Sequence, residues 1–227
     1  MRALLRSAGA HARRVAPRPI ALLAIVALVA VPATAVLVGG GSAPALAAPG
    51  IVPLRVSSGE DIATGFAVGD GRVVTVAHVV DGPVTVRGRR VRVLRIDRRN
   101  DLALLSVPGV GASAPGLAAG APVIASAANG EHLRVIRLRD GGPTMLSVRV
   151  RRSIVAHVSA PGAASARVRP ALELAPSERQ GRVAPGDSGA AVVTDSGELA
   201  GILFAASRNR AGTAYAVDAG TLRDLLR

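Results

Sequence analysis

Between residues 54 and 217, valine, isoleucine and leucine occur in short runs that glycine and aspartate interrupt. Short β-branched runs bounded by such turn formers are typical of strands rather than helices. The runs form two sets on either side of residues 108–120, which are almost entirely proline, glycine, alanine and serine and predict a linker. The predicted strands are residues 62–68, 72–77, 84–86, 90–96 and 102–107, then 122–126, 133–138, 145–158, 168–174, 190–193, 199–204 and 213–217.

Local patterns refine this interpretation. Gly69-Asp70-Gly71 predicts a tight hairpin turn between the first two strands, because glycine supplies the positive φ that such turns need. Residues 220–227 alone show helical spacing. The pattern therefore predicts an all-β protein of two barrels or sandwiches with a short C-terminal helix. Strand 90–96 predicts one buried and one solvated face, since Val91, Val93, Leu94 and Ile96 interleave with Arg92, Arg95 and Asp97.

The N-terminal segment, residues 1–47, differs from the rest. Its first 19 residues contain arginines and no acid, and an uncharged apolar run follows at 20–38. A basic flank beside such a run predicts a segment that enters a membrane with its positive end inside. Ala45-Leu46-Ala47 offers a signal-peptidase site before Ala48. The length of the run suits both a cleaved signal and a retained anchor, so both remain open.

We therefore expect an exported protein, either secreted or anchored on the outer side of the cytoplasmic membrane. The first strand set would then occupy residues 48–107 and the second set, with the helix, residues 121–227. A membrane partner is expected only through residues 20–38. The oligomeric state is left open.

Composition removes several kinds of chemistry. The chain has no cysteine, which excludes structural disulfides, thiolate catalysis and sulfur-ligated zinc. No two histidines have metal-ligand spacing, so we expect neither a metal nor another cofactor. The net charge is +13, with every basic residue an arginine. The three aromatic residues are too few for the stacking surfaces of single-strand and RNA binders, so we expect no nucleic-acid partner.

Three separate stretches carry the candidate chemistry. Gly186-Asp187-Ser188-Gly189 presents a serine, whose hydroxyl is a weak nucleophile until a base takes its proton. His78 ends a predicted strand and can be that base. The imidazole must in turn be oriented by a carboxylate, and Asp101 opens an otherwise apolar strand.

Each of these residues also has a plain interpretation. Gly-Asp-Ser-Gly alone is a turn sequence, a single histidine is more often structural, and Asp101 alone could cap a strand. Together they occur in the order His, Asp, Ser. His78 and Asp101 lie in the first strand set and Ser188 in the second, which predicts a site between the two.

With these motifs the sequence resembles the trypsin/chymotrypsin-like serine proteases, in particular the cysteine-free bacterial branch that includes the HtrA-type proteases. The resembling stretches are residues 75–78, 100–105, 186–189, 201–202 and 215–217. The resemblance implies two six-stranded antiparallel β-barrels and the roles of general base for His78, orienting acid for Asp101 and nucleophile for Ser188. It also implies an oxyanion hole from the amides of Gly186 and Ser188. No PDZ-like domain is expected after the helix.

By alignment through Ser188, the resemblance places Arg182 at the base of the substrate pocket and Phe204, Ala205 and Ala206 on its wall. We expect a shallow pocket for small or medium apolar side chains, or for an acidic one if Arg182 points inward. Asp187 is expected to be held by internal hydrogen bonds rather than by a new N-terminal amine. The predicted function is an exported serine endopeptidase with a protein or peptide substrate. The alternative is a catalytically silent protein that keeps the fold as a binding module in the cell envelope.

Overall fold

The structure of the protein is a computed structural model that describes residues 51–110, 122–140, 142–158, 167–177, 181–207 and 209–227. All of them belong to one compact unit, Ala43–Arg227. The predicted targeting segment 1–47 and most of the predicted linker 108–120 lie outside the described residues. Within the described ranges, no helix is long and apolar enough to cross a membrane.

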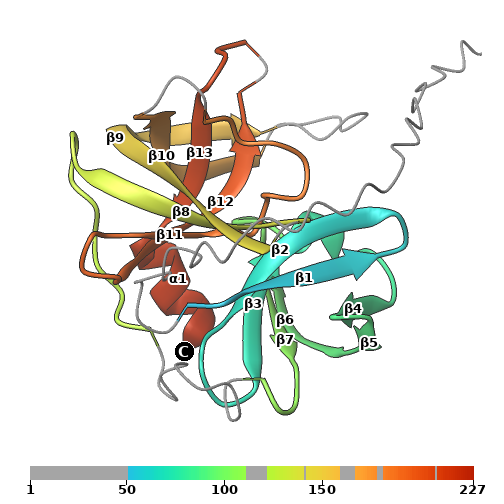
Figure 1. Cartoon of the computed structure of the whole chain (residues 1–227). Coiled ribbons are helices and arrows are strands. Elements are labelled where there is room, and N and C mark those ends of the chain that lie inside the picture. The colour runs from blue at the N-terminus through green and yellow to red at the C-terminus, as the bar shows by residue number, and fades with distance from the viewer. Residues whose placement is uncertain (1–50, 111–121, 141, 159–166, 178–180, 208) are drawn as a thin grey trace, which may run out of the picture. The chain divides into compact units, whose positions relative to one another are not determined.

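The first half is an antiparallel sheet with the strand order β5-β4-β1-β2-β3-β7-β6 (Figure 1). The predicted turn at Gly69-Asp70-Gly71 joins β2 to β3, and all three of its residues have positive φ. Glycine adopts this conformation freely and aspartate tolerates it. The strands are β1 (Pro53–Ser58), β2 (Asp61–Ala67), β3 (Arg72–Val76), β4 (Val84–Val86), β5 (Arg89–Arg90), β6 (Arg92–Asp97) and β7 (Leu102–Ser106).

The second half is a closed antiparallel barrel with the strand order β10-β13-β12-β11-β8-β9. Closure leaves no strand edge free in this half, so every strand has two hydrogen-bonded neighbours. The strands are β8 (His132–Arg139), β9 (Gly142–Val158), β10 (Arg167–Pro176), β11 (Ala191–Val193), β12 (Leu199–Ala206) and β13 (Ala214–Asp218).

Two short helices complete the described fold, the 3-10 helix η1 (Ala77–Val79) and the helix α1 (Ala219–Leu226). Asp218 caps α1, because its carboxylate accepts a hydrogen bond from the Thr221 amide at 2.9 Å. Leu222 and Leu225 of α1 are buried. They join a hydrophobic cluster that contains residues of both halves, such as Leu105 of β7 and Ile202 of β12. The two halves therefore share one core.

The predicted all-β architecture of two barrels with a short C-terminal helix is confirmed, with a closed barrel in the second half and a barrel-like sheet in the first. The first sheet has seven strands rather than six, and its strand β1 was not predicted separately. Residues 122–126 were predicted as a strand, which is wrong. They make one isolated bridge, Ile124 with Leu199, and Pro122 has no N–H with which to extend a ladder.

The predicted alternation along residues 90–96 is also wrong. The stretch divides into β5 and β6, and β6 ends the strand order of the first sheet. The register between β6 and β7 shifts between Val93 and Arg95. Such a bulge breaks the period of two, so Leu94 and Ile96 are 42% and 38% exposed instead of sharing a buried face.

Candidate active site

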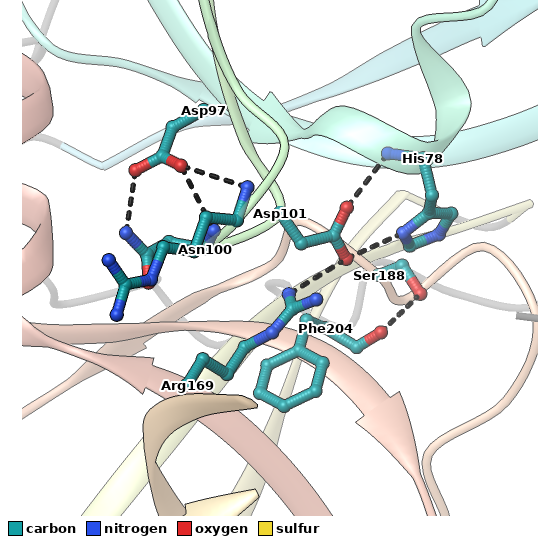
Figure 2. A network of polar contacts seen from close by, with 8 residues as sticks. His78, Asp97, Asn100, Asp101, Arg169, Ser188 and Phe204 are labelled. Carbon is teal, nitrogen blue, oxygen red and sulfur yellow. Dashed lines mark hydrogen bonds and ion pairs between the residues drawn. The ribbon is translucent and has the colours of Figure 1, made fainter. Parts of the chain in front are cut away.

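His78 is tied to Asp101 by two contacts, one from its side chain and one from its backbone. The distance from His78 Nδ1 to Asp101 Oδ2 is 2.8 Å, and the backbone N–H of His78 donates to Asp101 Oδ1 at 2.8 Å (Figure 2). A carboxylate accepts hydrogen bonds, so this geometry favours the imidazole tautomer with its proton on Nδ1. The opposite nitrogen, Nε2, is then able to accept a proton. The side chain is 47% exposed, so substrate can reach it.

Asp101 is positioned by a turn that precedes β7. Its own φ is +61°, an uncommon conformation that aspartate tolerates better than most residues. The Asp97 carboxylate accepts hydrogen bonds from the amides of Arg99 and Asn100 and from Asn100 Nδ2. Partial burial raises the pKa of Asp97, but the hydrogen bonds from Asn100 and Arg99 and the charge of Arg95 outweigh it and lower the pKa below its ordinary value. An ionised Asp97 therefore holds the turn at neutral pH.

Ser188 lies in the loop before β11. Gly186 in this loop has a φ of +88°, which a residue with a Cβ adopts only with strain. Among the hydrogen bonds between described residues, the amides of Gly186 and Ser188 donate none. The hydroxyl of Ser188 donates to the carbonyl of Phe204 at 3.5 Å. Within the same described contacts it makes no hydrogen bond to His78.

The loop of Ser188 is fastened to the first sheet by Thr64 of β2. The Thr64 amide donates to the Ser188 carbonyl at 2.8 Å, and the Thr64 hydroxyl donates to the Gly186 carbonyl at 2.8 Å. The strand β2 also contacts η1, which carries His78. Figure 2 shows His78, Asp101 and Ser188 gathered in one place. The three candidate residues therefore converge from both halves of the protein.

Asp187 is fully buried and is held from inside the protein, as expected. Its Oδ2 accepts hydrogen bonds from Arg139 Nη2 at 2.7 Å and from the Ala184 amide at 2.9 Å, and Arg137 Nη1 lies 3.6 Å away. Burial raises the pKa of Asp187, while the Ala184 amide and the two arginines oppose the rise. The backbone beside Ser188 is thus anchored by an internal ion pair.

The residues predicted for the substrate pocket do not gather as the triad does. Phe204 is buried, whereas Arg182 is exposed and lines a cavity of ≈ 230 Å³ together with Gly212 and Thr213. Ser188, Phe204, Ala205 and Ala206 do not line that cavity. The substrate pocket therefore remains a prediction.

A family model for the trypsin-like peptidase domain matches residues 63–202, more than half of the chain. The chain belongs to the trypsin-like peptidases. Members of this family are serine proteases, and so is this protein. No curated protein matches the chain in sequence.

Solved structures agree with this family. The Rv3671c protease from M. tuberculosis in its active form is 27% identical, with a TM-score of 0.64 over 79% of this chain and 80% of that one. The MamO protease domain from Magnetospirillum magneticum is 21% identical, with a TM-score of 0.59 over 79% and 97% of the two chains. For the serine endoprotease from Yersinia pestis the values are 21%, 0.55, 79% and 62%. The last two show a shared fold alone.

Sequence reasoning missed several residues that support the site of this trypsin-like peptidase. Asp97 belongs to a turn-forming stretch, Asp97-Arg98-Arg99-Asn100, whose composition could have revealed it. Thr64, Arg139 and Arg169 act across the fold, at large separations along the chain from the groups they contact. No local pattern marks them.

Proposed function

We propose that the protein is an exported serine endopeptidase that hydrolyses peptide bonds through an acyl-enzyme at Ser188. The observation that carries this proposal is the double contact between His78 and Asp101, beside a serine loop with two amides that donate no hydrogen bond to another described residue. Export is supported by the basic flank and apolar run of residues 1–38.

In the proposed mechanism, the Ser188 hydroxyl turns from the Phe204 carbonyl to His78 Nε2 when substrate binds. Catalytic hydrogen bonds often tighten only in that complex. Nε2 takes the proton as Ser188 Oγ attacks the substrate carbonyl carbon, and Asp101 stabilises the resulting imidazolium. The amides of Gly186 and Ser188 bind the developing oxyanion. His78 then protonates the leaving amine, and water activated by the same imidazole hydrolyses the ester.

The test is labelling of the purified full-length protein with a fluorophosphonate, together with hydrolysis of a peptide library. We expect the wild type to be labelled, and Ser188→Ala to lose labelling and activity, on the order of 10⁶-fold in kcat. Ser196→Ala changes a turn serine of the same barrel and should behave as the wild type. A folded wild type that is neither labelled nor active would instead favour a silent binding module.

A further inference from the structure

A buried arginine from the second barrel meets the carboxylate of Asp101. Arg169 of β10 is 3% exposed, and its Nη1 lies 3.5 Å from Asp101 Oδ2 (Figure 2). An arginine stays charged at any ordinary pH, and burying its charge costs several kcal/mol unless a partner compensates. The charge of this arginine therefore has to be compensated by neighbouring groups, and one of these groups is the Asp101 carboxylate.

The guanidinium is also supported by an aromatic pair. Its central carbon lies 4.9 Å from the centroid of the Phe204 ring. Phe204 in turn stacks on Tyr215, with centroids 6.3 Å apart and an interplanar angle of 28°. A desolvated cation over an aromatic face is attracted by the negative face of the ring. The rings on β12 and β13 thus fix the direction in which Arg169 points.

The contact joins the two parts of the proposed site. Asp101 Oδ2 lies 2.8 Å from His78 Nδ1 and 3.5 Å from Arg169 Nη1. His78 and Asp101 belong to the first half of the protein, and Arg169 belongs to the second half. Phe204, whose ring lies under Arg169, also accepts the hydrogen bond of Ser188 through its carbonyl. The packed pair of Arg169 and Phe204 therefore contacts Asp101 through the guanidinium and Ser188 through the Phe204 carbonyl.

We propose that Arg169 is a positioning residue, which holds the Asp101 carboxylate against the second barrel and so fixes the His78 imidazole relative to Ser188. This inference rests on the proposed triad mechanism. Because Arg169 is almost fully buried, it does not touch substrate. Its loss should therefore lower kcat and leave KM unchanged.

The test compares two variants with a matched control in the full-length protein. Arg169→Met keeps an apolar side chain on Phe204 but removes the charge, and Arg169→Lys restores a charge without the planar guanidinium. The control is Arg152→Met, which removes an arginine of the same barrel that pairs with the buried Glu173, a carboxylate that keeps Arg210 as a second partner. The measurements are kcat, KM, the fluorophosphonate labelling rate and the low-field NMR resonance of the His78 Nδ1 proton.

For Arg169→Met we expect kcat and the labelling rate to fall between about tenfold and a hundredfold, as for a small misplacement of reacting groups. KM should stay within about twofold, the Nδ1 resonance should shift or broaden, and Arg169→Lys should recover part of the loss. Unchanged or increased kcat with an unchanged resonance would overturn the proposal. If Arg169→Met does not fold, Arg169→Lys must show the same losses to a smaller degree, and wild-type behaviour there also overturns it.

The two proposals fail in different ways. If the wild type is neither labelled nor active, the protease mechanism fails, and the positioning role in it fails as well. If the wild type is active, the loss of labelling and activity in Ser188→Ala tests the mechanism. The Arg169 variants then test the positioning role separately. The NMR resonance separates a change in the His78–Asp101 contact from a general loss of stability, because Arg152→Met should leave it in place.

Discussion

Asp187 illustrates how a single buried charge can hold an active-site loop. It is fully buried one residue before Ser188, and Arg139 at 2.7 Å is its nearest charged partner. Removing one member of a buried pair leaves a charge that neither water nor a counterion compensates. The position of the Ser188 backbone should therefore depend on Arg139, which lies at the end of β8.

Arg139→Met should destabilise the protein by about 2 kcal/mol, less than a fully broken pair because Arg137 remains near Asp187. Labelling at Ser188 should fall with it, since the Gly186 and Ser188 amides would lose their fixed direction. Thermal unfolding and fluorophosphonate labelling measure the two effects. Arg134→Met on the same strand removes a pair with an exposed acid and should cost less than about 1 kcal/mol.

The cost of Arg139→Met should depend on pH in a definite direction. The pKa of Asp187 is raised above 3.8 by burial, so the folded protein holds a proton on this carboxyl more tightly than the unfolded chain does. Taken alone, this difference stabilises the folded state fully below pH 3.8, and the stabilisation is lost as the pH rises through the raised pKa. Arg139 matters only when Asp187 is charged, so the difference between variant and wild type should grow as the pH rises. A pH-independent difference in melting temperature would contradict this.

At this scale the sequence predicts which residues react but not which ones support them. His78, Asp101 and Ser188 stood out because each has a chemically distinctive neighbourhood along the chain. The arginines near Asp187 and Asp101 did not, because all of the chain's many basic residues are arginine and most of those in the described ranges are exposed. Whether an arginine is buried is decided by strand pairing and barrel closure, which local sequence does not encode.

At the scale of elements, the contact between β2 and the Ser188 loop is close enough to exclude a side chain. A Cβ built on Gly189 would lie 1.8 Å from the Thr64 carbonyl oxygen. That oxygen also accepts a hydrogen bond from Thr75 of β3 at 2.9 Å, so it is fixed in place. Gly189 is therefore required both by its positive φ of +86° and by the neighbouring strand.

Gly189→Ala should separate these two requirements when it is compared with Gly88→Ala. Both glycines have positive φ, but a Cβ at Gly88 would meet no atom within 4 Å. Gly88→Ala should cost only the conformational strain, about 1 to 2 kcal/mol. Gly189→Ala should cost at least about 3 kcal/mol more and abolish labelling, since the loop must leave β2. Equal melting temperatures for the two variants would show that the contact is not tight.

The elements themselves were largely predictable, and the exceptions have a common cause. Turn formers such as Gly69-Asp70-Gly71 mark hairpins whatever the rest of the fold does. The exposed Leu94 and the single bridge at Ile124 depend on the partner strand, through the bulge between β6 and β7 and the short pairing with Leu199. Register and pairing length are tertiary properties, so periodicity alone does not reveal them.

At the scale of the whole protein, the proposed site requires the two halves to keep a fixed position relative to each other. One hydrophobic cluster contains residues of both, and α1 contacts β7 of the first half as well as β12 and β13 of the second. Arg95 of β6 donates to the carbonyls of Asp224 and Leu225 at the end of α1, where a cation is favoured. The helix that follows the last strand of the second half is thus also bound to the first half.

Leu222→Ala should therefore destabilise both halves together. Leu222 is fully buried in the shared cluster, so its truncation should cost about 2 to 5 kcal/mol. Hydrogen exchange should show the most protected amides of β3 and β7 losing the same free energy as those of β12 and β13, because a shared core unfolds as one cooperative unit. Leu94→Ala changes a residue that is 42% exposed and should leave the amide protection of both halves unchanged. A loss of amide protection confined to the second barrel would mean that the halves unfold separately. The Asp101–His78 pair and Ser188 would then be aligned by local contacts, such as those of Thr64, rather than by a common core.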